Sequence, residues 1–278
     1  MIEQNKRFLE LAETVKIEIV ETGYACLGRE WHQEEVCSPY SRLYYVISGS
    51  GILVIRGGGN REKREKRERL LLPGRVCLIP NGLYYDYRCE DRLEKVYFHV
   101  NVRMQDGFDL FRGCEDSYEF SLGEEYPERI KVLYESSDPA DYFALKGEIY
   151  SAIARFITAA DLQDKAVRTY SPLMAQLFAL LPQRIAFPVT IKELAKALNV
   201  SESTLAKRFR KETGMTVGSY MDQLLMGRAR QLLAAGNRSI GEIAEELGFC
   251  DQFYFSRYFR KKQGETPSSY KRRYHGRG

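Results

Sequence analysis

The last third of the chain contains one segment written twice. Residues 190–195 (Thr-Ile-Lys-Glu-Leu-Ala) align with residues 239–244 (Ser-Ile-Gly-Glu-Ile-Ala) at an offset of 49. Farther on the offset is 50, and seven of the sixteen positions from Leu205 to Tyr220 are identical to their partners. One residue has therefore been inserted within the second copy. A repeat of this length requires two similar supersecondary units that follow one another.

Each copy predicts a helix, a tight turn and a second helix. A capping box, Thr-x-x-Glu from residue 190 and Ser-x-x-Glu from residue 239, opens each first helix. Asn199 and Gly248 stand where that helix ends, and both residue types enter the left-handed region that such a turn requires. Ser201 and Asp251 stand at the N-cap position of the second helix. The predicted core residues of the two helix-turn-helix units are Ala195, Leu198, Val200, Leu205 and Phe209, and Ala244, Leu247, Phe249, Phe255 and Phe259.

Two further helices are expected around the repeats. Ser171 and Pro172 predict the start of a helix that runs to Leu181. Between the repeats, apolar side chains follow one face of a predicted long helix that ends at Gly236. That helix would hold the two units in a fixed relation. Its stripe is Val217, Tyr220, Met221, Leu224, Leu225, Arg228 and Leu232.

The charge of the chain is distributed unevenly. Residues 190–278 contain 17 Lys and Arg against 9 Asp and Glu, whereas residues 1–189 contain 25 against 29. The net charges are therefore +8 and −4, which sum to the +4 of the whole chain. A basic module on an acidic body is typical of a nucleic-acid reader. A merely solvated basic face would not explain why the excess coincides with the repeat.

The composition suits two globular domains. With 278 residues, 44% of them hydrophobic, the chain can form two cores. The six cysteines show neither a C-x-x-C pair nor zinc-finger spacing. The first residues lack the apolar core of a signal peptide, and no run reaches membrane-spanning length. We therefore expect a cytoplasmic protein with reduced cysteines and no membrane partner.

Residues 1–103 predict a β domain. Short apolar runs at 43–47, 52–55, 76–79 and 95–100 are separated by Gly, Pro, Ser and Asn. Many short strands with such turns favour a sandwich or barrel, with a small jelly roll as the simplest form. The charged run at 60–69 has two interpretations, a nucleic-acid arm or a solvated hairpin tip, and the tip is favoured.

Residues 104–165 predict a helical segment that leads into a linker at 161–168. Asp138 and Pro139 have the N-cap and first-turn positions of one helix. Its apolar stripe could pack on the sheet or on a second copy of the chain, which would make a homodimer. The stripe is Tyr142, Leu145, Ile149, Ile153, Phe156 and Ala160. Residues 171–278 then form the DNA-binding domain.

The C-terminal third resembles the AraC/XylS family of transcription regulators. The residues that carry the resemblance are 248–249 (Gly-Phe), 253–260 (Phe-Tyr-Phe-Ser-Arg-Tyr-Phe-Arg), 264–267 (Gly-Glu-Thr-Pro) and 270–272 (Tyr-Lys-Arg). The N-terminal part is similar to the family's cupin-like, arabinose-binding domain at 43–51, 72–74 and 79–80. The resemblance implies an α+β multidomain fold and a sequence-specific regulator that binds double-stranded DNA. It also implies control by a small-molecule effector, a sugar or related metabolite. We further expect a homodimer, on the basis of the apolar stripe described above, and leave RNA polymerase open as a further partner.

Outward positions on the second helix of each unit are the candidates for reading DNA. Lys207 and Arg257 would face guanine, Gln252 adenine, and Ala206 or Phe253 a thymine methyl. For Phe253, packing in the core is the alternative. The resemblance supports the following as base-facing: Ser203, Ala206, Lys207, Gln252, Phe253, Ser256 and Arg257. The expected phosphate contacts are Thr204, Arg210, Lys211, Arg260, Lys261 and, in the same basic run, Lys262.

An aromatic interior in the β domain could hold one small ligand. Because strand residues alternate between faces, at most one of Tyr44 and Tyr45 can point inward. The resemblance places Tyr87 where the family has a ligand tyrosine, although core packing remains the alternative for any single ring. The candidate effector contacts are Trp31, Arg42, Tyr44, Tyr85, Tyr87 and Lys95.

A metal-dependent cupin enzyme tethered to DNA is the competing hypothesis. Such a site requires about three His and a carboxylate on the strands, and this chain has only His32, His99 and His275. We therefore expect no catalytic residue, metal or cofactor. A DNA-binding regulator without a ligand is the second alternative, and neither the effector nor the sign of regulation follows from the sequence.

Overall fold

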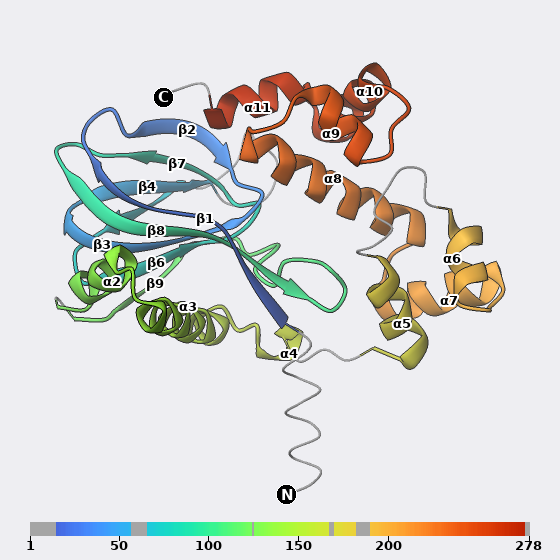
Figure 1. Ribbon diagram of the computed structural model, residues 1–278, viewed down its shortest axis with the longest axis horizontal. Coiled ribbons are helices and arrows are strands. Elements are labelled where there is room, and N and C mark those ends of the chain that lie inside the picture. The colour runs from blue at the N-terminus through green and yellow to red at the C-terminus, as the bar shows by residue number, and fades with distance from the viewer. Residues whose placement is uncertain (1–14, 57–65, 124, 167–169, 182–189, 276–278) are drawn as a thin grey trace, which may run out of the picture. The chain divides into compact units, whose positions relative to one another are not determined.

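The computed structural model describes residues 15–56, 66–123, 125–166, 170–181 and 190–275. The chain divides into two compact units (Figure 1). The first contains Met1–Met104 and Phe108–Arg168, and the second contains Gln105–Gly107 and Thr169–Gly278. Residues 60–65 of the charged run lie outside the described residues, so its two interpretations stay open.

The first unit is a sandwich of two antiparallel sheets. The first sheet has the order β1 (Val15–Leu27), β8 (Leu93–Met104), β3 (Ser41–Gly49), β6 (Arg75–Ile79), β9 (Tyr118–Ser121). The second has the order β2 (His32–Cys37), β7 (Tyr84–Arg88), β4 (Gly51–Arg56), β5 (Lys66–Leu71). The predicted fold class, a β domain followed by a helical domain, is confirmed.

Strand alternation creates a separate core on each side of the first sheet. Tyr44 packs with Leu53 and Tyr85 in the core between the sheets. Its neighbour Tyr45 packs with Phe98 in the core on the outer face. The expectation that the two tyrosines point in opposite directions is confirmed, because successive strand residues face opposite sides.

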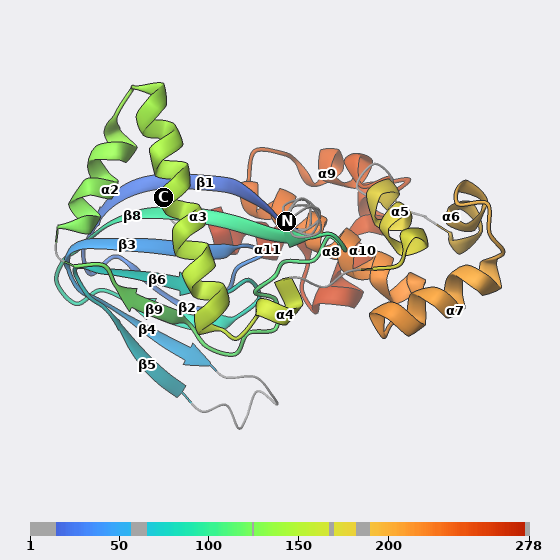
Figure 2. The same ribbon diagram turned by 90° about the horizontal axis from the view of Figure 1, so that it is seen from below.

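Two helices cover the outer face of the first sheet, α2 (Tyr126–Glu135) and α3 (Pro139–Ala159), and α3 runs across the strands (Figure 2). The predicted N-cap is confirmed, since Asp138 accepts a hydrogen bond from the Ala140 amide at 2.8 Å. Leu145, Ile149, Ile153 and Phe156 are buried as predicted. The inclusion of Tyr142 in the buried stripe is wrong, because its side chain is 54% exposed beside Phe143.

The segment expected to be a plain linker contains a short helix, α4 (Gln163–Ala166). The Lys165 ammonium donates to the carbonyl oxygens of Leu110 at 2.6 Å and Arg112 at 3.0 Å. These hydrogen bonds attach α4 to the first unit. Strand β9 and helix α2, in the stretch 104–135, have weak sequence patterns and were not predicted.

The second unit is helical: α5 (Pro172–Leu180), α6 (Ile191–Ala197), α7 (Glu202–Thr213), α8 (Val217–Ala235), α9 (Ile240–Glu246), α10 (Gln252–Gln263) and α11 (Pro267–His275). Both capping boxes are present. Asn199 and Gly248 have φ of 53° and 78°, as the turns require. Ser171 stands at the N-cap of α5, but its hydroxyl donates to Glu212 at 2.7 Å instead of capping the helix.

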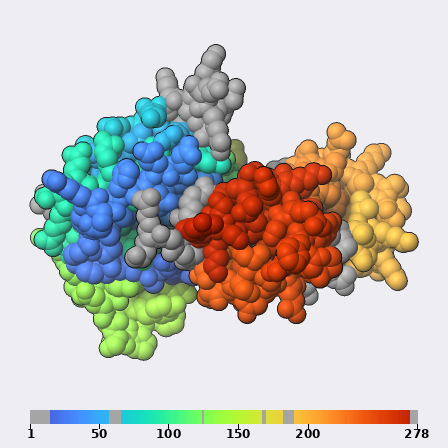
Figure 3. All heavy atoms as spheres, turned by 90° about the horizontal axis from the view of Figure 1, so that it is seen from above, coloured from blue at the N-terminus to red at the C-terminus, as the bar shows by residue number. Residues whose placement is uncertain are grey.

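Each helix-turn-helix has its own aromatic core, and α8 takes part in both. Phe178, Phe209 and Tyr220 contact one another in the core of the first helix-turn-helix. Phe249 of the turn and the buried side chains of α9 and α10, Phe255 among them, pack with Leu225 to Leu233 of α8. In the space-filling view, the orange and red helices of this second motif form one compact mass (Figure 3).

Candidate functional site

Helices α7 and α10 each have one buried and one exposed face. Leu205 and Phe209 of α7 are fully buried, as are Phe255 and Phe259 of α10. These pairs are spaced four residues apart, so they anchor one side of each helix to its core. The opposite side is left free for a partner. In α7 it includes Ser203, Ala206, Lys207 and Arg210, and in α10 Phe253, Ser256, Arg257 and Arg260.

The side chains predicted to face bases are exposed in both helices, except that Ser256 is half-buried. For Phe253 the two alternatives were a contact with DNA and packing in the core. Its ring is 68% exposed, so core packing does not explain it. An aromatic side chain left in water at the start of a helix is more typical of a contact surface than of a solvated face.

Most of the predicted phosphate contacts are exposed cations that form no salt bridge to a described residue. Lys211, Arg260 and Lys261 form no salt bridge within the described part of the chain, and the same holds for Lys207 and Arg257. The Arg257 guanidinium lies 5.9 Å from the centre of the Tyr254 ring.

The interpretation of Lys262 as a phosphate contact requires a correction. Its ammonium pairs with Asp222 of α8, which also accepts a hydrogen bond from the Tyr258 hydroxyl. This arrangement ties the middle and end of α10 to α8, and it gives the exposed Lys262 ammonium an intramolecular counter-charge. Sequence reasoning did not single out Asp222.

Helices α7 and α10 have different N-cap residues, Ser201 and Asp251, and the extra residue of the second copy, Cys250, directly precedes Asp251. In α7 the Ser201 hydroxyl accepts one hydrogen bond, from the Thr204 amide at 3.1 Å. In α10 the Asp251 carboxylate accepts two, from the amides of Phe253 and Tyr254, both at 2.7 Å. The hydrogen bond from the Tyr254 amide, followed by that from the Cys250 thiol, lowers the pKa of Asp251. The carboxylate is thereby fixed at the positive end of the helix, directly beside Phe253.

In the β domain, the six candidate effector residues lie in one contiguous cluster between the sheets. The Lys95 ammonium lies 3.5 Å from the centre of the Tyr44 ring and 4.0 Å from that of Trp31. Trp31 stacks on Tyr87 at 4.3 Å, and Tyr87 lies 6.2 Å from Tyr85. The remaining member, Arg42, donates to the Tyr44 hydroxyl at 3.3 Å and lies 5.9 Å from the Tyr85 ring.

Two cations inside this cluster lack acidic partners. Arg42 is 9% exposed and Lys95 is 3% exposed, and neither forms a salt bridge to any residue that the structure describes. The Nε of Arg42 has no hydrogen-bond partner there. Burial, followed by repulsion from Arg42, lowers the pKa of Lys95 well below its ordinary value. Buried cations without a counter-charge are costly, which is characteristic of a site shaped for a ligand.

Among the described residues no group of three or more His, Cys, Asp or Glu could hold a metal ion. His99 instead stacks on Tyr40 at 4.4 Å, and its Nδ1 lies 2.8 Å from the Glu21 carboxylate. Burial lowers the pKa of His99 to about 4 in spite of that carboxylate. None of the described helices has the length and apolar character needed to cross a membrane.

The helix-turn-helix domain family matches residues 194–273. The Msm operon regulatory protein of Streptococcus mutans is 22% identical over 240 residues, which are 83% of each chain. The HTH-type transcriptional activator RhaR of Salmonella arizonae is 28% identical over 193 residues, which are 66% of each chain. Among solved structures, ToxT of Vibrio cholerae O395 bound to (E)-4-(8-methylnaphthalen-1-yl)but-3-enoic acid has a TM-score of 0.52 at 11% identity. That match covers 94% of this chain and 99% of ToxT.

The family match falls on the two helix-turn-helix motifs of the second unit. The matched domain contains both α7 and α10. The similarity to the Msm regulator covers 83% of the chain and therefore extends into the β domain. The relatives are transcription regulators and not enzymes, so the tethered-enzyme hypothesis is discarded. The C-terminal unit therefore carries a helix-turn-helix domain, and over most of its length the chain is similar to transcription regulators.

Proposed function

We propose that α7 and α10 read bases in two successive major grooves. The observation that carries this proposal is the exposed face of each helix, where uncommitted cations lie opposite a buried aromatic anchor. Helix α8, which joins the two motifs, has 19 residues and is therefore about 28 Å long. This length suits recognition helices placed about one DNA turn, roughly 34 Å, apart. Each protomer would then bind an asymmetric site.

The two helices are proposed to read different bases. Lys207 and Arg257 would donate to guanine and Gln252 to adenine, while Phe253 would contact a thymine methyl. Phe253 replaces the Ser203 of the first copy, so the motifs share a scaffold without sharing a recognition face. The other proposed base contacts are Ser203, Ala206 and Ser256, and the proposed phosphate contacts are Thr204, Arg210, Lys211, Arg260 and Lys261.

A pair of arginine variants tests these roles. A binding site is first selected from a random DNA pool at fixed salt. Arg257→Ala should then cost about 1–3 kcal/mol on that site and relax specificity at one position, whereas Arg260→Ala should weaken all sequences alike. Arg129→Ala, which removes one cation from the β domain, is the matched control and should leave binding unchanged. Equal losses on selected and random DNA for Arg257→Ala would contradict the base-reading role.

For the β domain we propose regulation by a small-molecule effector held by Trp31, Arg42, Tyr44, Tyr85, Tyr87 and Lys95. The two buried cations favour a sugar or related metabolite that carries a carboxylate or phosphate, because an anion would supply the missing counter-charge. ToxT, which has the same fold, has been solved with a small acid bound. A protein of this fold can therefore hold a small ligand.

The effector proposal is tested on the full chain by thermal unfolding against a panel of sugar acids and sugar phosphates. An effector that binds the folded state raises the unfolding temperature. The same compound should change DNA affinity, and Lys95→Met should abolish both effects. If no compound shifts either quantity, the regulator without a ligand becomes the better hypothesis.

A homodimer through α3 is proposed from the face that the sheet leaves uncovered. Phe143 and Tyr150 are 69% and 49% exposed, and they are seven residues apart on one side of the helix. Sedimentation should show a dimer that Phe143→Ser and Tyr150→Ser dissociate. A wild-type monomer at all concentrations tested would contradict this proposal.

A further inference from the structure

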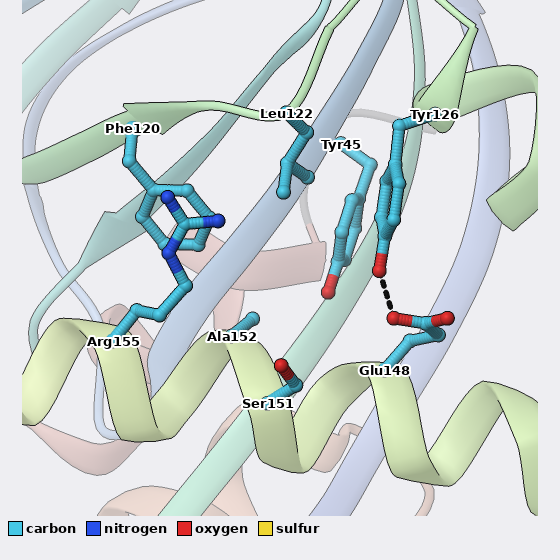
Figure 4. Close-up of a pocket in the computed structure, with 8 residues that line it drawn as sticks. All are labelled: Tyr45, Phe120, Leu122, Tyr126, Glu148, Ser151, Ala152 and Arg155. Atoms are coloured by element: carbon cyan, nitrogen blue, oxygen red, sulfur yellow. Dashed lines mark hydrogen bonds between the residues drawn. The ribbon is translucent and has the colours of Figure 1, made fainter.

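A second pocket lies outside the sandwich interior, between α3 and the outer face of the first sheet (Figure 4). Its volume is about 180 Å³. It is separate from the effector cluster, because it is bordered by Tyr45 on the outer face of β3 whereas Tyr44 points inward. The lining residues are Tyr45, Phe120, Leu122, Tyr126, Glu148, Ser151, Ala152 and Arg155.

The Tyr45 side chain brings an uncommitted hydroxyl to this pocket. The residue is 1% exposed, and its hydroxyl has no hydrogen-bond partner among the described residues. Figure 4 shows this hydroxyl directed toward α3, beside the ring of Tyr126. Burial raises the pKa of Tyr45, so the group is a neutral O–H donor. Buried hydroxyls without a partner are rare, and this one indicates an acceptor other than the described residues.

The charged groups of the pocket leave one cation uncommitted. The Glu148 carboxylate accepts a hydrogen bond from the Tyr126 hydroxyl and forms an ion pair with Arg129 at 3.1 Å. The Arg155 guanidinium lies over the ring of Phe120, 3.7 Å from its centre, and forms no salt bridge within the described ranges. Besides the Ser151 hydroxyl, which can donate or accept, the Tyr45 hydroxyl and the Arg155 guanidinium are donors without an acceptor among the described residues. A planar guanidinium matches a carboxylate through two parallel hydrogen bonds.

The size and walls limit the rest of the ligand. Phe120, Leu122 and Ala152 supply apolar surface. A cavity of about 150 Å³ is known to accommodate benzene, so a pocket of about 180 Å³ suits a body of about one ring. A sugar fits less well, because its several hydroxyls would face these apolar walls without partners.

We propose that this pocket binds a small monocarboxylate with an apolar body of about one ring. The carboxylate pairs with Arg155 and accepts the Tyr45 hydroxyl proton in a hydrogen bond, while the body lies against Phe120 and Leu122. Because α3 supplies Arg155 and the sheet supplies Tyr45, the ligand links helix to sheet. It therefore stabilises the packing of the helix whose other side exposes Phe143 and Tyr150.

The test uses the full chain, with phenylacetate as the probe and its neutral analogue 2-phenylethanol for comparison. Isothermal titration should show phenylacetate binding at least tenfold more tightly than the alcohol. Arg155→Gln should weaken phenylacetate at least tenfold. Tyr45→Phe should weaken it several-fold while leaving the unfolding temperature of the ligand-free protein unchanged or higher, because it removes a buried hydroxyl without a partner.

Two controls make the result specific. Lys146→Gln removes another cation from α3, away from the pocket, and should leave phenylacetate affinity unchanged. Lys95→Met alters the effector cluster and should also leave it unchanged, so the two sites can fail independently. Loss of binding in Lys95→Met but not in Arg155→Gln would overturn the proposal. A wild-type dissociation constant weaker than about 10 mM would overturn it as well.

Discussion

Replacing Lys95 by methionine should stabilise the β domain. The substitution keeps the length and apolar character of the side chain and removes only the ammonium group. That ammonium is 3% exposed and forms no salt bridge in the described structure. Its contacts with the rings of Tyr44 and Trp31 offset part of the desolvation cost, but the pKa of Lys95 is still lowered. The charged form is therefore less stable in the folded state than in water.

The size of the effect follows from linkage. In the unfolded chain a lysine has a pKa of about 10.4, and a lowered folded pKa means that folding is penalised below that pH. At pH 7 the penalty cannot exceed about 5 kcal/mol, because each pH unit between pH 7 and about 10.4 contributes at most about 1.4 kcal/mol. We expect Lys95→Met to raise the free energy of unfolding by about 1–4 kcal/mol at pH 7.

The pH dependence has a definite sign. Between the lowered folded pKa of Lys95 and about 10.4, the unfolded chain binds more protons, so the stability of the wild type rises with pH. The advantage of the variant should therefore shrink to about 0.5 kcal/mol at pH 10. Lys131→Met is the control. Lys131 pairs with Glu94 at 3.1 Å, which raises its pKa, so its loss should lower stability at pH 7.

The stability of the β domain in wild type and Lys95→Met can be compared through tryptophan fluorescence. Trp31 is the sole tryptophan of the sequence, and it stacks inside the same cluster. Its fluorescence during guanidinium unfolding therefore reports the β domain without a signal from the helical unit. Lys95→Met could prove less stable than wild type at pH 7, or the difference in free energy of unfolding could be the same at pH 7 and pH 10. Either result would mean that other interactions offset the desolvation of the buried ammonium, and the prediction would be wrong.

Three further outcomes are expected. Ser239→Ala removes half of the capping box of α9 and should cost about 1 kcal/mol in thermal unfolding, so unchanged stability would contradict the role of the cap. The His99 imidazole should titrate by NMR with a pKa near 4, because burial disfavours its charged form. The free energy of unfolding should therefore fall as the pH is lowered from about 6.5 toward 4. A measured pKa near 6.5 would argue against the burial of His99. Asp222→Asn releases Lys262 and should steepen the salt dependence of DNA binding by about one counterion, whereas an unchanged slope would mean that Lys262 does not reach DNA.

The helical unit was largely predictable because its signals are local. Capping boxes, left-handed turn residues and buried aromatic residues at helical spacing act within one or two turns of chain, and the repeat presents each of them twice. The departures arise where a distant segment intervenes. Lys262 is held by Asp222, which is 40 residues away, and Ser171 donates to Glu212, which is 41 residues away. Neither partner can be inferred from local spacing.

The β domain shows the opposite balance. Strand alternation predicted that Tyr44 and Tyr45 face opposite sides, and the rings and cations of the effector cluster were selected by residue type. Their proximity depends on pairing across the sheets, such as the register that sets Val46 opposite Lys95 and Ile55 opposite Tyr85. The pocket of Tyr45 and Arg155 had no sequence signal, because α3 covers the sheet through contacts between segments about 100 residues apart.

The sequence by itself therefore determined the doubled helix-turn-helix, its caps, its buried anchors and the charge that favours DNA, because each depends on neighbouring residues. Only the tertiary structure decided that Phe253 is exposed and that Lys262 pairs with Asp222. It also decided that Arg42 and Lys95 are buried with no salt bridge to a described residue. Burial and electrostatic pairing are properties of surfaces brought together by folding. A pattern along the chain cannot report them until the register of the sheets and the packing of the helices are known.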